Sequence, residues 1–418
     1  MIRLFRRHRL AVAGAVLLCA LAATAYAAHR VTEKKTHRTV ELYTFADNPK
    51  WFQTELDRVA TTGGTIRLPA GHVASLTLLA LAPTAPIRLV GRPSTMLAGL
   101  LVKRSGNISV SGVRFVPDGQ PAIADVRGSH DVTFRNVHFL ATQEDQGVAL
   151  QLDDADRNVT VANSEFVTCQ HGLACILAQG RGLTIDHVTF RHVRDADVIR
   201  GAADDVTISD SDLHDALPGT HADNHNDLIQ ILGGGPWTIE RNHFGVRANG
   251  AAQLYVDPRS GPRGPAHDIR VYSNLFTGEN KDMYFAIQLR TPAESAMPVP
   301  DGVEIVNNTI LSANAAALDI ADEYAKLPAS RRPLVENNIL NLQKHDLCGL
   351  ARTRTNVVEK GIACPGDRSG DAHLAADGRP TAASAALLAK GTAAGAPATD
   401  YAGKQRADPP AIGAFELR

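Results

Sequence analysis

The sequence predicts an all-β protein, a single-stranded right-handed parallel β-helix with an N-terminal capping helix. Three observations lead to this expectation. A nine-residue pattern occurs nine times between Asn107 and Leu340, positions two and four are both apolar in eight of the copies, and successive copies lie 23 to 34 residues apart. One such unit cannot bury its apolar face alone, whereas stacked neighbours can, so a repeat of this length indicates a solenoid. The period-two alternation favours strands over helical repeats.

Two positions of the pattern, the fourth and the seventh, are informative when the nine copies are compared. In order, the copies are NISVSGVRF, DVTFRNVHF, NVTVANSEF, GLTIDHVTF, DVTISDSDL, PWTIERNHF, DIRVYSNLF, GVEIVNNTI and RPLVENNIL. The fourth position is β-branched or aromatic in every copy, which favours extended backbone. The seventh position becomes asparagine in the last four copies, at Asn242, Asn274, Asn308 and Asn338. We expect these amides to point inward as a ladder that bonds the turns above and below. Independent turns that each favour asparagine are the alternative.

With these coils, with TIRLPAGHV at 65–73 and with the tail DYAGKQRADPPAIGAFEL at 400–417, the chain resembles the pectate-lyase-like superfamily of secreted right-handed parallel β-helix proteins over residues 45–345. The resemblance implies a carbohydrate-active protein, and the superfamily contains lyases, hydrolases, epimerases and non-catalytic surface proteins. The stretch HADNH at 221–225 does not reproduce the DPHD signature of mannuronan epimerases. No catalytic residue is therefore carried over from a family motif.

The two ends of the chain suggest export and coverage of the solenoid. Residues 1–28 combine a basic start, an apolar stretch and a small-x-small site at 25–27, which is typical of a secretory signal peptide; an uncleaved membrane anchor is the alternative. We expect a periplasmic or extracellular protein, with a membrane partner only if this segment is retained. A capping helix is predicted before Gly63, and residues 346–418 are expected to form a tail that packs on the last coil.

Composition narrows the class of partner. The chain has 44% hydrophobic residues and 43 basic against 44 acidic side chains, so it has no charge bias and nucleic acid is not an expected partner. After cleavage of the signal, four cysteines remain. In an oxidising compartment their spacing predicts two local disulfides, Cys169 with Cys175 and Cys348 with Cys364. Neither pair has the spacing of a zinc site.

A second strand precedes each nonapeptide, and its outward residues are the candidate binding surface. Alternation directs one polar residue of each strand outward, and adjacent coils lie about 4.8 Å apart. The expected file is Gln151, Arg200, Gln230, Tyr255, Gln288 and Asp319. Such a file suits a polysaccharide, whose hydroxyls and carboxylates need amide and guanidinium partners. A solvated strand face is the alternative.

Long loops near this file hold the densest group of titratable residues, which comprises His214, Asp215, His221, Asp223, His225 and Asp227. Such groups transfer protons near neutral pH or bind divalent cations. Asp227 starts the strand that carries Gln230, and Asp197 has the same place one coil earlier, beside Arg200. A merely solvated polar loop is the alternative.

Two chemistries need different members of this face. A lyase or C5-epimerase acting on a uronate polymer must neutralise a carboxylate and remove the C5 proton. Calcium could assist, with Asp197 and Asp223 as candidate ligands. The fitting residues are Arg200 and Arg290 as cations and His225, Tyr255 and Lys281 as bases. A glycoside hydrolase would instead need two carboxyl groups, from Asp197, Asp227 and Asp257. We predict a lyase or epimerase, and a non-catalytic polysaccharide-binding protein is the further alternative.

Overall fold

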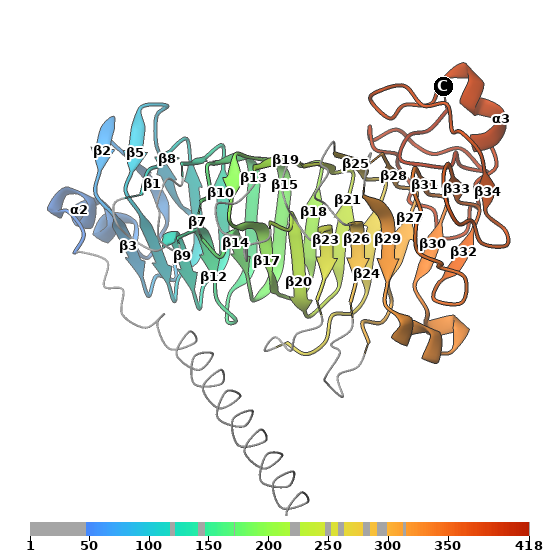
Figure 1. Ribbon diagram of the computed structural model, residues 1–418. Helices are drawn as coiled ribbons and strands as arrows, with labels where there is room; N and C mark the ends of the chain where they lie inside the picture. Colours follow the sequence, from blue (N-terminus) through green and yellow to red (C-terminus); the bar gives the residue numbers. More distant parts are fainter. Residues whose placement is uncertain are drawn as a thin grey trace, which may run out of the picture. The chain divides into compact units, whose positions relative to one another are not determined.

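In the computed structural model, which describes residues 47–117, 122–140, 147–170, 172–217, 226–246, 252–257, 263–278, 285–290, 299–311 and 315–417, parallel strands stack along one axis (Figure 1). The expected right-handed parallel β-helix is confirmed. Among the described residues, no helix is long and apolar enough to cross a membrane. The predicted signal peptide, residues 1–28, lies outside the described residues.

The second strands of the coils form one continuous sheet, called the site sheet below. Its strands are β3 (Leu76–Leu79), β6 (Leu100–Lys103), β9 (Ala122–Arg127), β12 (Val148–Leu152), β14 (Ala174–Ala178), β17 (Asp197–Ala202), β20 (Ile229–Gly233), β23 (Ala252–Val256), β26 (Phe285–Leu289) and β29 (Ala316–Ile320). Every pairing in it is parallel and joins consecutive coils.

The nonapeptides form the larger sheet, in two rows that meet at a corner. The first row holds β1 (Gly64–Arg67), β4 (Ile87–Val90), β7 (Gly106–Ser111), β10 (His130–Arg135), β13 (Arg157–Val167), β15 (Arg181–Arg191), β18 (Val206–Ser209), β21 (Trp237–Glu240), β24 (Ile269–Tyr272), β27 (Glu304–Val306), β30 (Leu334–Glu336) and β32 (Arg352–Arg354). The second row holds β2 (Gly71–Val73), β5 (Thr95–Leu97), β8 (Arg114–Phe115), β11 (His138–Leu140), β16 (Val193–Arg194), β19 (Asp212–Leu217), β22 (His243–Val246), β25 (Leu275–Gly278), β28 (Thr309–Ile310), β31 (Ile339–Leu340), β33 (Val357–Val358) and β34 (Arg368–Ser369). Strands β13 and β15 run through both rows.

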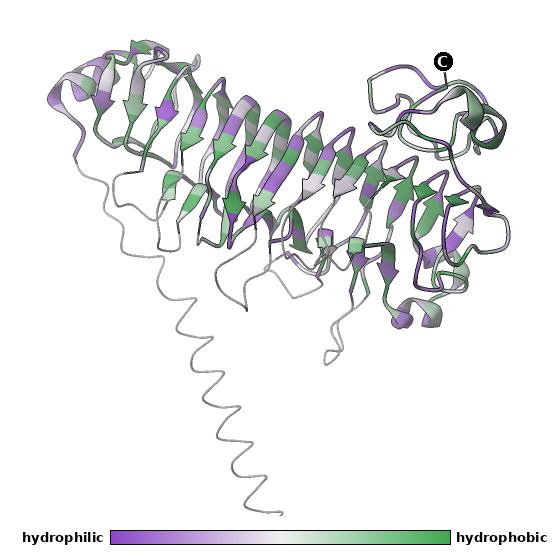
Figure 2. Ribbon diagram, turned by 45° about the horizontal axis from the view of Figure 1, so that its top comes forward, coloured by the Kyte–Doolittle hydropathy of each residue, from purple (hydrophilic) through white to green (hydrophobic). Residues whose placement is uncertain are grey.

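The interior of the coils is filled by columns of equivalent side chains. The residue at the fourth position of the nonapeptide is buried in all nine copies. Along the strands, hydrophilic and hydrophobic residues alternate (Figure 2). Aromatic rings at the ninth position stack face to face, with centroids 4.6 Å apart for Phe115 and Phe139 and 4.4 Å apart for Phe139 and Phe166. The same stacking joins Phe244 to Phe276 at 4.4 Å. The apolar columns predicted from the sequence thus form one continuous core.

The asparagine ladder at the seventh position is present. Oδ1 of Asn274 accepts the backbone N–H of Asn242 at 2.8 Å, and Oδ1 of Asn308 accepts that of Asn274 at 2.9 Å. The Asn308 amide donates to the carbonyl of Val271 at 2.8 Å, and Asn338 repeats the pattern one coil later. The ladder extends to Ser211, Asn356 and Asp367. It satisfies polar groups that the corner between the two rows would otherwise bury unpaired.

A second ladder ties the corner between the site sheet and the first row. Ser129 Oγ accepts the backbone N–H of Ser105 at 3.1 Å, and Asp156 Oδ1 accepts that of Ser129 at 2.8 Å. The other oxygen of Asp156 accepts the N–H of Asp153, also at 2.8 Å. The Asp156 side chain is buried. Burial raises the pKa of Asp156 to about 7, although both N–H donors favour its charged form.

A helix covers the first coil, as expected. Helix α2 (Lys50–Val59) buries Phe52, Leu56 and Val59 against the coil, whereas Trp51 remains 40% exposed. The helix ends before Gly63, whose φ of 82° lies in the left-handed region that glycine adopts without strain. An added Cβ there would lie 2.0 Å from the carbonyl oxygen of Ala85, so only glycine fits.

The C-terminal segment continues the solenoid and then folds back along it. Strands β32, β33 and β34 extend the larger sheet past residue 345. Four short helical elements accompany the end of the chain: η1 (Asp322–Lys326) and η2 (Ala329–Arg331) precede these strands, and η3 (Ala382–Ser384) and α3 (Ala385–Leu388) follow them. Beyond them the carbonyl of Thr399 accepts the hydroxyl of Ser273 at 2.9 Å, and the guanidinium of Arg406 donates to the same hydroxyl at 2.9 Å. The tail thus contacts coils well before the last one.

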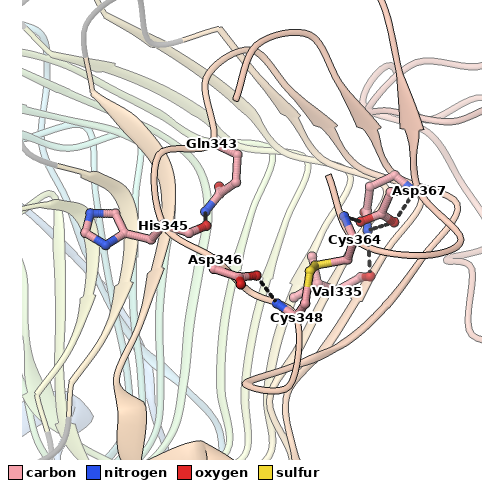
Figure 3. The surroundings of a disulfide bond; sticks show 8 residues. Val335, Gln343, His345, Asp346, Cys348, Cys364 and Asp367 are labelled. Atoms are coloured by element: carbon pink, nitrogen blue, oxygen red, sulfur yellow. Dashed lines mark hydrogen bonds between the residues drawn. A yellow bond between two sulfur atoms is a disulfide. The ribbon is translucent and has the colours of Figure 1, made fainter. Parts of the chain in front are cut away.

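Both predicted disulfides form. Cys169 is bonded to Cys175, and Cys348 is bonded to Cys364. The second bridge closes the turn around Asp346, whose carboxylate accepts the N–H of Cys348 at 2.8 Å (Figure 3).

We expect Asn308→Ala to lower the free energy of unfolding by about 3 kcal/mol, because it leaves the buried N–H of Asn274 and the carbonyl of Val271 without their partner. Chemical denaturation measures the change. Asn163→Gly, at an exposed left-handed turn position, is the control and should change stability little. Equal stabilities of the two variants would contradict a structural role for the ladder.

The raised pKa of Asp156 predicts that stability depends on pH. Between about pH 4 and 7 the carboxyl is protonated in the folded protein and ionised in the unfolded chain, so folding takes up a proton and stability falls as pH rises through this window. The slope from this group approaches about 1.4 kcal/mol per pH unit. Denaturation of wild type and Asp156→Asn at several pH values isolates this contribution, and two parallel stability curves would refute it.

Candidate functional site

The predicted polar file occupies a single register on the site sheet. Parallel pairing places each member opposite the next, in the order Asp125, Gln151, Leu177, Arg200, Gln230, Tyr255, Gln288 and Asp319. All six residues of the predicted file are included, even though the coils between them differ in length. Neighbouring members are separated by the strand spacing of about 4.8 Å. The structure therefore places the guanidinium of Arg200, the amides of Gln230 and Gln288 and the phenol of Tyr255 on four consecutive coils, while the apolar Leu177 separates Arg200 from Gln151.

The members of the file differ in accessibility. Gln151, Arg200 and Tyr255 are half-buried, whereas Gln230 and Gln288 are 1% and 2% exposed. The accessible groups near the centre of the file are thus the guanidinium of Arg200 and the phenol of Tyr255. They lie two coils apart, with the buried amide of Gln230 between them.

Arg200 is held in place by a buried carboxylate. Its Nη1 donates to Oδ2 of Asp197 at 3.1 Å, and the Asp197 side chain is 2% exposed while that of Arg200 is 23% exposed. A guanidinium has five N–H donors, so this bond leaves others for a ligand. Asp197 fixes the orientation of Arg200.

Asp197 and Asp227 themselves form a third ladder. Oδ1 of Asp197 accepts the backbone N–H of Asp227 at 3.0 Å, and Oδ1 of Asp227 accepts that of Ala252 at 3.0 Å. Both carboxylates are buried, with Asp227 fully so. Asp227 was proposed as a catalytic carboxylate, but it precedes β20 and its side chain is fully buried. In the described geometry both aspartates support the turns that lead into their strands.

Three candidate residues remain among those that the structure describes. Asp257 and Arg290 directly follow strands of the site sheet, and Asp319 is the last member of the polar file. Asp257, at the end of β23, is 5% exposed, and Arg290, at the same place one coil later, is exposed. Oδ2 of Asp319 accepts the amide of Gln288 at 2.7 Å, and the ring of His345 lies 3.7 Å from the other oxygen. The far end of the file is therefore acidic.

Three predicted residues, Asp223, His225 and Lys281, lie outside the described residues. Their roles stay predictions. Of the bases proposed for a lyase or epimerase, Tyr255 is the one on a described strand.

Within the described residues, two groups bring three potential metal ligands close together. The first is Asp346 with Cys348 and Cys364, whose sulfurs are committed to a disulfide. The second is Asp186 with His187 and Asp210, where Asp210 accepts two bonds from Arg241 at 2.9 and 2.7 Å. Asp197 belongs to neither group. Among these two groups, only the donor atoms of Asp186, His187 and Asp210, at the surface, are compatible with a bound cation. Calcium binding at Asp197 stays a prediction.

A titratable cluster on the second row was not predicted as a unit. His243 contacts Asp212 and Thr277, and His214 shares Asp212. Of these four residues, only His214 belongs to the group of titratable residues predicted from the sequence. Asp212 and His243 occupy the eighth position of consecutive nonapeptides, and comparing that column would have shown that they are neighbours.

No protein-family model matches the chain, and no curated protein does. Among solved structures, the surface adhesin PfbA of Streptococcus pneumoniae is 12% identical, with 78% of this chain and 88% of that one covered and a TM-score of 0.41. Alginate lyase AlyF-OU02 in complex with G6 is 13% identical over 90% and 94% of the two chains, with a TM-score of 0.43. Pectate lyase Pel9A is 14% identical over 88% and 91%, with a TM-score of 0.43. These likenesses concern the fold alone, and the strand pairing itself establishes the parallel β-helix.

Proposed function

We propose that the protein binds an acidic, uronate-containing polysaccharide along the polar file of the site sheet and acts on it as a lyase or C5-epimerase. The observation that supports the proposal most directly is the unbroken register from Gln151 to Asp319, with Arg200 and Tyr255 as its accessible central members. A polymer lying along the helix axis would meet the accessible side chains of Arg200 and Tyr255 two coils apart, at a separation of about 10 Å.

Arg200 is the residue we assign to the substrate carboxylate. The ion pair with Asp197 restricts its rotamers, so less conformational entropy is lost when a second carboxylate binds. Guanidinium binds carboxylate through two parallel N–H donors. Neutralising the uronate also favours loss of the C5 proton, because the negative charge that develops spreads onto the carboxylate.

Tyr255 is the residue we assign to the proton transfer among the described candidates. As a base it would take the C5 proton while the electron pair of the C–H bond moves toward the carboxylate. In a lyase, that pair then forms the C4=C5 double bond as the C4–O bond breaks and the leaving oxygen takes up a proton. In an epimerase, a proton returns to C5 from the other face. His225 and Lys281 stay the alternative bases.

The burial of the aspartates favours this chemistry over glycoside hydrolysis. A hydrolase needs two carboxyl groups that flank the scissile bond and reach the substrate. Asp197, Asp227 and Asp257 are 2%, 0% and 5% exposed, and the first two accept backbone N–H groups of neighbouring coils. The same burial is also compatible with a non-catalytic binding protein, which is our second candidate function.

Export is part of the proposal. Two disulfides stabilise the coils, and such bonds persist in oxidising compartments. Together with the signal-like N-terminus, they support a periplasmic or extracellular protein that meets polysaccharide outside the cytoplasm.

We expect Arg200→Ala to lower kcat/KM on a uronate polymer by about 10² to 10³-fold, because charge stabilisation is lost. Tyr255→Phe should abolish turnover while leaving affinity nearly unchanged, since only the hydroxyl is removed. The assays are absorbance of the new C4=C5 double bond and exchange of the C5 hydrogen in D₂O, which detects an epimerase. Binding without either signal would identify the non-catalytic candidate.

Arg135→Ala is the matched control, because Arg135 is an exposed arginine on the first row of the larger sheet. Arg200→Lys keeps the positive charge but removes the bidentate geometry of the guanidinium. Its kcat/KM should therefore lie between those of the wild type and Arg200→Ala. The assignment is wrong if Arg135→Ala loses as much activity as Arg200→Ala. It is equally wrong if both Arg200→Ala and Tyr255→Phe remain fully active on a demonstrated substrate.

A further inference from the structure

Three side chains on the second row of the larger sheet are in contact across three consecutive coils. Asp212 lies on β19, His243 on β22 and Thr277 on β25. Parallel pairing sets Asp212 opposite His243 and Gly245 opposite Thr277. The three residues belong to a different sheet from the polar file.

The distances join them in a fixed order. Nδ1 of His243 lies 2.8 Å from Oδ1 of Asp212, and Nε2 of the same ring lies 2.8 Å from Oγ1 of Thr277. A neutral imidazole has one N–H, so the carboxylate accepts Nδ1–H and Nε2 is left to accept the hydroxyl proton. This is the arrangement by which a hydroxyl nucleophile is activated: a base within hydrogen-bond reach and a carboxylate that orients the base.

Gly245 makes room for the imidazole. Its φ is not in the left-handed region, so backbone geometry does not require glycine there. A Cβ at this position would lie 3.1 Å from Cε1 and 3.4 Å from Nε2 of His243. Glycine within a strand weakens the strand and often marks a close approach by another group. Here it lets the ring reach across to Thr277.

The electrostatics of the cluster support the same order of proton transfer. Burial alone would raise the pKa of Asp212, but hydrogen bonds and the charges of His214 and His243 lower it well below its ordinary value. Asp212 is therefore ionised at neutral pH and accepts the hydrogen bond from Nδ1–H of His243. The His214 ring lies 3.1 Å from the same carboxylate oxygen, and this carboxylate raises the pKa of His214.

The cluster is accessible. The side chain of His243 is 28% exposed, that of Asp212 is 43% exposed, and Thr277 is half-buried. A buried hydrogen-bonded network that served packing alone would not need to leave the imidazole open to solvent.

We propose that Thr277, His243 and Asp212 form a second catalytic centre that hydrolyses small O-acyl esters by acyl transfer. Thr277 Oγ1 attacks the ester carbonyl while His243 Nε2 takes its proton. The C–O bond of the ester breaks, and the alcohol leaves with the proton from His243. Water, deprotonated by His243 Nε2, then attacks the acyl carbonyl of acyl-threonine. The bond from this carbonyl carbon to Thr277 Oγ1 breaks, the carboxylic acid leaves, and His243 returns the proton to Thr277 Oγ1. The proposal does not rest on the polysaccharide activity.

The test uses the full chain with 4-nitrophenyl acetate and an O-acetylated polysaccharide as ester probes. Thr277→Val removes the nucleophile at nearly constant shape and should lower kcat/KM for ester hydrolysis by at least about 100-fold. His243→Gln should have a comparable effect, whereas Thr277→Ser should retain activity. Mass spectrometry after rapid acid quench should find one acetyl group on the peptide that contains Thr277. Thermal unfolding confirms that each variant is folded.

Thr184→Val is the control, because Thr184 is a half-buried threonine on the first row of the same sheet. The proposal is overturned if Thr277→Val retains the wild-type rate, which would mean that imidazole attacks the ester directly. Acetylation of another residue in place of Thr277, or hydrolysis no faster than that of the heat-denatured protein, overturns it as well.

Discussion

The fold depends on satisfying the polar backbone groups at the corners of each coil. Along the strands the parallel ladders pair N–H and C=O groups, but at the corners the backbone turns away from its neighbours. Stacked side chains fill this need: the asparagines from Asn242 to Asn338, the Ser129 and Asp156 pair, and the Asp197 and Asp227 pair. Because each amide or carboxylate bonds an adjacent coil, one coil fixes the height of the next, and strands separated by loops of different length stay in register.

This constraint also determines what the faces can do. A rigid stack holds outward side chains at a constant repeat, so Arg200, Gln230 and Tyr255 line up although 30 and 25 residues separate them in sequence. The buried aspartate that supports a turn is also the residue that orients Arg200. A corner ladder and a candidate binding group therefore share one side chain, and the loss of Asp197 would affect both stability and ligand contacts.

Sequence alone predicted the features that repeat. The nonapeptide columns gave the strands, the inward apolar stack, the asparagine ladder and the order of the outward file, because period-two alternation is a local property. It did not predict the burial of Asp227, because this residue lies in the turn before β20, where strand alternation does not apply. Nor did it predict that the tail would contact Ser273, because that contact spans more than 100 residues and no local pattern encodes it.

The cluster around His243 was not predicted from the sequence for a related reason. Asp212, His243 and Thr277 are 31 and 34 residues apart, and each alone is an ordinary polar residue on an exposed strand face. Only the register, which the corner ladders enforce, places them in contact across three coils. A glycine that no turn requires, Gly245, is the local sign that the imidazole of His243, two residues earlier on the same strand, lies close to the backbone there.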